Sequence, residues 1–191
     1  MQLKSFCLTV AAVLAIGITA STQAAVITTF TSANVPVAIC DTCTFTSTLN
    51  IDSHGRVLDI NALLDITHSY DADLVLSLSH GGTTVLLSNR QGGSGGANYT
   101  GTVFDDEADI GIDAGYAYAP YTGSFRPEEA LAAFIDQDIF GDWTLTMTDS
   151  EAGDAGTLNN WGITAAVPEP ASLALLGLGL AGFVTARRRR S

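Results

Sequence analysis

The sequence predicts an all-β protein built from packed antiparallel sheets. Between its two ends, the chain consists of short runs of β-branched and apolar residues separated by Gly, Asp, Asn and Ser, a pattern typical of strands and turns. In one run Leu74, Leu76 and Leu78 fall on alternate positions, so they share one face of a strand. Helix signals are few. Together these observations favour two sheets packed face to face as a β-sandwich.

The first 25 residues are predicted to be a secretory signal peptide. Lys4 precedes an apolar run from Phe6 to Ile18, and small and polar residues follow as far as Ala25. A positive start, a short apolar stretch and a small-residue exit are the parts of such a signal, and the stretch is short for a membrane span. A buried helix would need a polar face, which this run lacks. We expect cleavage after Ala24 or Ala25 and export of the chain.

Residues 26–43 are predicted to form an N-terminal extension that carries a Cys-x-x-Cys pair. Cys7 leaves with the signal peptide, so the mature chain keeps Cys40 and Cys43. Their neighbours are extended in character, whereas a thioredoxin-like redox pair would lie between a strand and a helix. In an oxidising compartment we therefore expect a local structural disulfide between Cys40 and Cys43. Zinc would need two further ligands, which the sequence does not suggest.

The sandwich is predicted to occupy residues 44–166. The expected strands are Thr44–Ile51, Val57–Ile66, Asp73–Ser79, Thr83–Leu87, Trp143–Thr148 and Trp161–Ala165. His80, Gly81 and Gly82 mark a hairpin turn. Arg126–Phe134 has proline and acids early, as a helix start prefers, and predicts a helix of about two turns.

The C-terminal residues 167–191 have three parts in order. Pro168, Glu169 and Pro170 come first, an apolar run from Ala171 to Ala186 follows, and a cluster of four arginines, Arg187, Arg188, Arg189 and Arg190, ends the segment. The run predicts a short transmembrane helix of about 24 Å, and the arginines keep its end in the cytoplasm. A plain tail anchor is the simpler alternative.

This three-part order resembles the PEP-CTERM sorting signal of Gram-negative bacteria that make exopolysaccharide. The resemblance implies recognition and removal by an exosortase-type transpeptidase. The chain would then be anchored transiently in the inner membrane before it reaches the cell surface or the extracellular space.

Five blocks of the middle segment resemble the P domain of the proprotein convertases, also called the P/Homo B domain. They are Ile66–Leu76, Thr102–Asp106, Ala119–Pro127, Gly141–Leu145 and Asp149–Trp161. The resemblance implies a jelly-roll, galactose-binding-like β-sandwich, a module that usually follows a subtilisin-like serine protease domain. About 40 residues separate Val26 from Ile66, far fewer than a catalytic domain needs. We therefore expect no enzyme activity, and the resemblance to a module of serine endopeptidases does not imply that this chain is one.

Single motifs also argue against catalysis. Ser94 lies in a Gly-x-Ser-x-Gly match, but no helix follows it, so we expect a flexible glycine loop. His54 lies in a polar turn, His80 is expected in an exposed loop, and His68 is expected to be a hydrogen-bonded structural residue. Trp143 and Trp161 are expected in the core.

Acidic side chains at strand ends are candidate calcium ligands. The segment Val26 to Ala166 has three basic and nineteen acidic residues, a net charge of −16, which excludes nucleic acid as a partner. The candidates are Asp71, Asp73, Asp105, Asp106, Asp149 and Asp154, with Asp73, Asp105 and Asp106 the most favoured. Calcium takes six to eight oxygen ligands from such loops. The spacing leaves open whether they bind Ca²⁺ or are solvated turn residues.

The sequence predicts a non-catalytic exported protein of the surface or extracellular matrix. An alternative is an exopolysaccharide-binding module, with Tyr116, Tyr118 and Tyr121 as an exposed aromatic set. Another is an accessory that docks onto a separate secreted protease.

Overall fold

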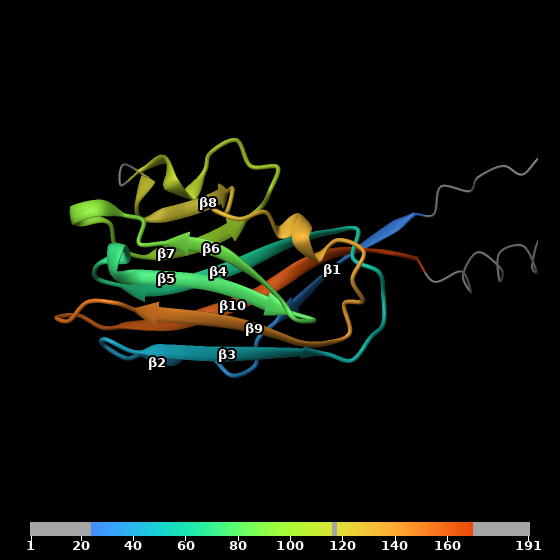
Figure 1. Cartoon of the computed structure of the whole chain (residues 1–191), viewed down its shortest axis with the longest axis horizontal. Helices are drawn as coiled ribbons and strands as arrows, with labels where there is room; N and C mark the ends of the chain where they lie inside the picture. Colours follow the sequence, from blue (N-terminus) through green and yellow to red (C-terminus); the bar gives the residue numbers. More distant parts are fainter. Residues whose placement is uncertain (1–23, 116–117, 170–191) are drawn as a thin grey trace, which may run out of the picture.

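The computed structural model describes residues 24–115 and 118–169 (Figure 1). Outside these residues lie the predicted signal peptide up to Gln23, Tyr116, Pro170, the C-terminal apolar run from Ala171 to Ala186 and the four arginines. Within the described ranges, no helix is long and apolar enough to cross a membrane.

Ten strands and several short 3-10 turns make up the described chain. The strands are β1 (Ala25–Thr31), β2 (Val37–Ile39), β3 (Thr44–Ile51), β4 (Asp59–His68), β5 (Leu74–His80), β6 (Thr83–Asn89), β7 (Tyr99–Phe104), β8 (Tyr121–Phe125), β9 (Gly141–Asp149) and β10 (Gly156–Pro168). The turns are η1 (Asp71–Asp73), η2 (Gly93–Gly95), η3 (Ile112–Ala114) and η5 (Leu131–Phe134). The all-β prediction is confirmed.

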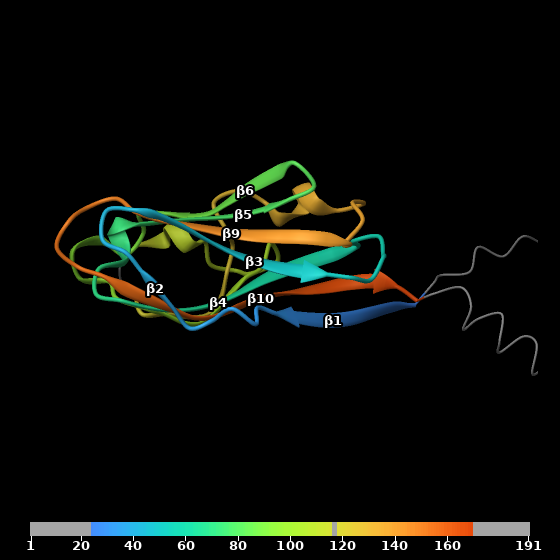
Figure 2. The same cartoon turned by 90° about the horizontal axis from the view of Figure 1, so that it is seen from below.

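Two sheets face each other, as Figure 2 shows from the side. One has the order β1-β10-β4-β7-β8, with β2 also paired to β10, and the other has the order β3-β9-β5-β6. All neighbours are antiparallel except β7 and β8. Residues with an inward side chain alternate along β4 and β5, so each sheet turns one apolar face to the other.

The core forms between the two sheets. Leu74, Leu76 and Leu78 are fully buried, as their alternation predicts. Trp143 and Trp161 are buried too, and each indole N–H has an acceptor: the carbonyl oxygen of Ile139 at 3.0 Å and Ser47 Oγ at 2.7 Å. A buried Trp needs such a partner, because an unpaired donor in the core costs stability.

The segment before residue 44 is part of the sheet. All seven residues of β1 pair with β10, from Ala25 opposite Pro168 to Thr31 opposite Gly162, and β2 pairs with the start of β10. Both ends of the described chain therefore lie side by side at one end of the sandwich (Figure 1).

The predicted helix at Arg126–Phe134 is wrong. The structure has only the 3-10 turn η5 at its end, and Glu128 and Glu129 run alongside β6 instead. Their backbone N–H groups donate to the carbonyls of Leu87 and Leu86, and the Glu129 carboxylate accepts from Leu86 N at 2.8 Å. Bonds to a neighbouring strand replace the i to i−4 bonds that a helix requires.

Candidate functional site

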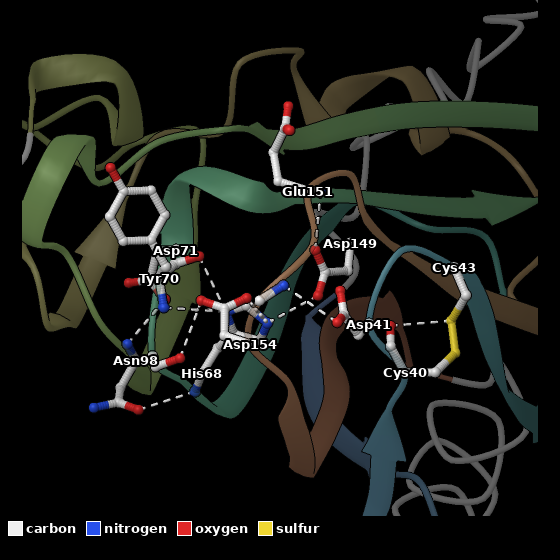
Figure 3. Close-up of polar contacts among 12 residues, drawn as sticks. Cys40, Asp41, Cys43, His68, Tyr70, Asp71, Asn98, Asp149, Glu151 and Asp154 are labelled. Carbon is white, nitrogen blue, oxygen red and sulfur yellow. Dashed lines mark hydrogen bonds and ion pairs between the residues drawn. A yellow bond between two sulfur atoms is a disulfide. The ribbon is translucent and has the colours of Figure 1, made fainter.

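Four segments bring polar side chains together at the end of the sandwich opposite Ala25 and Pro168 (Figures 1 and 3). β4 ends at His68, η1 contributes Asp71 and Asp73, β9 ends at Asp149, and the β9–β10 loop supplies Asp154. Strand ends meet here because neighbouring strands of each sheet finish at this edge. We call His68, Asp71, Asp73, Asp149 and Asp154 the end-loop cluster.

His68 lies at the centre of the end-loop cluster, and its side chain is completely buried. Nδ1 is 3.0 Å from the carbonyl oxygen of Tyr70 and 3.2 Å from the Tyr70 backbone nitrogen, so Tyr70 can serve either tautomer. Nε2 is 3.3 Å from Asp149 Oδ2 and 3.8 Å from Asp154 Oδ1. One imidazole nitrogen therefore faces two carboxylates.

The two facing carboxylates are each oriented through their other oxygen. Asp149 Oδ1 accepts from the backbone N–H of Glu151 at 3.3 Å, and Asp154 Oδ2 accepts from Ser69 Oγ at 3.0 Å. The Asp149 side chain is fully buried, and that of Asp154 is 18% exposed. Asp154 Oδ1 is itself buried and has no hydrogen-bond partner. The ligand atoms of His68, Asp149 and Asp154 lie within 4.8 Å of one another.

Asp71 adds a third carboxyl group, and it is buried. Its Oδ1 accepts from the backbone N–H of Asn98 at 2.9 Å, but its Oδ2 is buried without a hydrogen-bond partner. Burial raises the pKa of Asp71 to about 7, although the bond from Asn98 and the charge of His68 act in the opposite direction.

The carboxyl group of Asp73 is buried and has several negatively charged neighbours. Burial, and then the charges of Asp154, Asp149 and Glu151, raise the pKa of its carboxyl group. Arg90 opposes this effect, but its guanidinium binds Glu151 at 2.8 Å. The end-loop cluster thus has a local excess of carboxylates over cationic groups, and a bound cation would relieve it.

Asp105 and Asp106 lie at the other end of β4. They follow Phe104, which pairs with Ala62. A hydrogen bond to Asp105, then burial and the charge of Asp59 at the start of β4, raise the pKa of Glu107. Both oxygens of Asp106 are engaged, because they accept from the backbone N–H groups of Leu131 and Ala132 at 2.9 and 2.8 Å. The six predicted ligands therefore separate into two groups, and four of them belong to the end-loop cluster.

The tyrosines do not form the predicted exposed set. Tyr121 lies in β8 with no exposed surface, its ring stacked on Tyr99 with 5.1 Å between centroids, so its assignment as a surface ligand-binding residue is wrong. Tyr118 is 42% exposed, and Tyr116 lies outside the described residues. Tyr121 faces inward because it occupies a strand position on the core side of its sheet.

His80 is buried, contrary to the expectation of an exposed loop. Its ring stacks on Trp143, with centroids 4.0 Å apart, and its nitrogens lie 2.9 and 2.7 Å from the carbonyl oxygens of Asp142 and Asp138. His54 is exposed and bonds Asp138 Oδ2 at 2.7 Å through Nδ1. Ser94 is exposed in the short turn η2 rather than at the start of an α-helix.

Cys40 and Cys43 are joined by a disulfide in the loop between β2 and β3. Between them, Asp41 accepts from the backbone N–H of Gly153 at 3.2 Å. The disulfide loop is thereby tied to the β9–β10 loop that presents Asp154 (Figure 3).

The fold and the end-loop cluster define a β-sandwich module with a buried His/Asp constellation in its loops. Residues 57–165 match the family model of the proprotein convertase P-domain, and residues 166–190 match that of the PEP-CTERM protein-sorting motif. The chain belongs to the proprotein convertase P-domain family. The sorting motif that follows implies export and processing by an exosortase-type system.

The solved structures that resemble this chain include two of one serine protease. The serine protease of Aeromonas sobria in complex with its chaperone ORF2 is 16% identical over 76% of this chain, with a TM-score of 0.47. The same protease alone is 15% identical over 75% of this chain, with a TM-score of 0.47. This chain spans 27% of each of those protease chains. FLHE is 9% identical over 75% of this chain and 98% of its own, with a TM-score of 0.44. No curated protein matches the chain.

Proposed function

We propose that this protein is a non-catalytic module of the cell surface or extracellular matrix, exported by a signal peptide at residues 1–25 and delivered by its C-terminal signal. The observation that carries the proposal is the order of the two family matches, because the P-domain ends at residue 165 and the sorting motif begins at residue 166. A P-domain is an accessory module, so its work is binding or stabilisation rather than bond cleavage.

Fractionation of cells that express the full-length chain tests this proposal. In a bacterium with an exosortase, we expect a shortened chain at the cell surface or in the medium. In the same strain without the exosortase, the uncut chain should stay in the membrane fraction. A chain that remains in the cytoplasm of both strains, or that stays uncut in the first, contradicts the proposal.

Divalent cation binding at the end-loop cluster is the second part of the proposal, with Ca²⁺ as the ion that the sequence favours. Support comes from the convergence of the buried Asp71, Asp73 and Asp149 with the partly buried Asp154, near few cationic groups. An ion that binds only the folded state stabilises it by about 2.7 kcal/mol at a hundredfold excess over its dissociation constant. Thermal unfolding with calcium and with a chelator, at matched ionic strength, should differ by several degrees.

Docking onto a separate secreted protease is a second candidate function, and the family match favours it because P-domains accompany subtilisin-like catalytic domains. Deletion of the gene should then remove most extracellular protease activity. Unchanged activity, together with normal surface delivery, leaves the structural role as the function. Retention on exopolysaccharide resin would instead support a carbohydrate-binding module.

A further inference from the structure

We propose that His68, Asp149 and Asp154 bind a divalent transition-metal ion of the Zn²⁺ type in preference to Ca²⁺. This inference rests on the cation-binding part of the proposed function and specifies the ion. It would make the imidazole of His68 a ligand, whereas the sequence indicates only a structural role for that residue.

The ligand atoms have the spacing of a metal site. In a tetrahedral site with bonds of about 2.1 Å, neighbouring ligand atoms are about 3.4 Å apart. Here His68 Nε2 lies 3.3 Å from Asp149 Oδ2 and 3.8 Å from Asp154 Oδ1. All three atoms lie within 4.8 Å of one another, so small side-chain adjustments bring them onto one ion.

The other polar atom of each ligand side chain has a hydrogen bond to a group that lies outside the metal position. The Tyr70 carbonyl oxygen can accept a hydrogen bond from the Nδ1–H of His68, and in that tautomer the lone pair of Nε2 is free for a metal. Ser69 Oγ and the Glu151 N–H hold the outer oxygens of Asp154 and Asp149. Such supporting contacts are typical of metal-binding histidines and carboxylates, because they fix the tautomer and the direction of each ligand.

Two orphaned oxygens provide an observation independent of this spacing. Asp154 Oδ1, on the His68 side of its carboxylate, and Asp71 Oδ2 are both buried without a hydrogen-bond partner. Asp71 has no exposed surface, and Figure 3 shows it beside His68 and Asp154. A buried carboxylate oxygen without a partner is costly, and a cation in the cluster would compensate for it.

The donor set selects the class of ion. Imidazole nitrogen suits Zn²⁺ and its neighbours in the transition series, whereas Ca²⁺ requires six to eight oxygen ligands. The donor atoms that face one another are His68 Nε2, Asp149 Oδ2 and Asp154 Oδ1. A fourth position remains for water or for another carboxylate of the cluster. Cys40 and Cys43 do not compete for the ion, because their sulfur atoms form a disulfide.

Titration of the purified, chelator-treated full-length chain with Zn²⁺ alone and with Ca²⁺ alone tests the inference. We expect one Zn²⁺ to bind per chain and to raise the unfolding temperature by several degrees. Asp154→Asn should abolish this rise, because the amide keeps an acceptor for Ser69 while it loses the charge. Asp105→Asn, at the other end of β4, should retain the full response.

A cobalt-substituted sample provides a readout independent of stability. Co²⁺ in the wild-type chain should give the visible absorption of a low-coordinate site with nitrogen and oxygen ligands, and His68→Gln should lose it. Stabilisation by Ca²⁺ but not by Zn²⁺ would overturn this inference and leave the cation part of the proposed function intact. A response to neither ion would overturn both, and a Zn²⁺ response that persists in Asp154→Asn would place the ion elsewhere.

Discussion

Both oxygens of the Asp106 carboxylate hold backbone groups of a neighbouring turn. It accepts from two backbone N–H groups at the start of η5, those of Leu131 and Ala132. We expect Asp106→Ala to lower the free energy of unfolding by about 1–3 kcal/mol, because one of these groups is partly buried and both lose their acceptor. Chemical denaturation measures this loss.

The neighbouring residue provides a control for Asp106. The Asp105 carboxylate accepts from the backbone N–H of Glu107, within its own turn, so Asp105→Ala should cost clearly less. If Asp106→Ala and Asp105→Ala are equally stable, the hydrogen bonds of Asp106 to Leu131 and Ala132 do not have the proposed stabilising effect. Loss of the cation response in Asp106→Ala alone would instead make Asp106 a ligand.

Asp138 should contribute to acid sensitivity. Hydrogen bonds from His54, and from the backbone N–H groups of Gly55 and Phe140, lower the pKa of Asp138 to about 2. Its unfolded-state pKa is near the ordinary 3.8, so the folded chain holds this proton less tightly than the unfolded chain. The stabilisation is present above pH 4 and is lost as the pH falls from about 4 to 2.

Acid titration of unfolding checks the role of Asp138. Asp138→Asn should be less stable than the wild type at pH 6, and the difference should narrow towards pH 2. Asp52→Asn, two residues before His54, controls for the loss of one surface carboxylate. Parallel curves for wild type and Asp138→Asn would contradict the expectation.

At the scale of residues, the sequence identified the chemistry but not the grouping. Acids at strand ends were visible as candidates, and four of the six meet in the end-loop cluster. Spacing along the chain could not show that Asp105 and Asp106 lie at the far end of β4, because that depends on strand pairing. His68 lies in one of the P-domain blocks, but the sequence does not show that it lies close to Asp149 and Asp154, so it does not indicate a ligand role. His80 next to two glycines resembled a surface turn, but its ring packs on Trp143.

At the scale of elements, glycine 162 permits β1 to pair with β10. A Cβ on Gly162 would collide with the backbone carbonyl oxygen of Phe30 in β1. We therefore expect Gly162→Ala to displace β1 and to lower the free energy of unfolding by about 1–3 kcal/mol, as other forced overpacking does. Denaturant unfolding provides the measurement.

Gly95→Ala is the matched control for Gly162→Ala. A Cβ on Gly95 would meet nothing within 4 Å, so this variant should keep the stability of the wild type within about 0.5 kcal/mol. Equal behaviour of the two variants would show that β1 contributes little to the folded state.

Strand runs with clear alternation were predictable, and pairings over long distances were not. The boundaries of β3 agree with those expected from the sequence, and those of β4, β5, β6 and β9 differ by a few residues. The expected strand Trp161–Ala165 covers only the central part of β10, which runs from Gly156 to Pro168. Apart from Ala25, β1 and β2 lie in the expected N-terminal extension, because the sequence does not show that they pair with β10, more than a hundred residues away. The acidic start of the expected helix binds β6, a tertiary contact that outweighs local helix preference.

At the scale of the whole molecule, net charge should govern the response to salt. The segment from Val26 to Ala166 has a net charge of −16, so its carboxylates repel one another in the compact state. We expect sodium chloride to raise the unfolding temperature by several degrees in the presence of a chelator, because the Debye length falls from about 30 Å at 0.01 M to about 8 Å at 0.15 M. Choline chloride should act equally if screening is general. No rise with either salt would contradict this expectation.

The pairing of Ala25 with Pro168 also determines how the domain carries mechanical load. A force applied between Pro168 and the end-loop cluster runs lengthwise along β10, whose ladder with β4 extends from Ala166 opposite Asp59 to Gly156 opposite His68. The hydrogen bonds of that ladder are then loaded together in shear. A force that separates Ala25 from Pro168 instead peels β1 from β10 one pair at a time. A tether at the C-terminal side and a contact at the far loops would thus pull the sandwich in its mechanically strong direction.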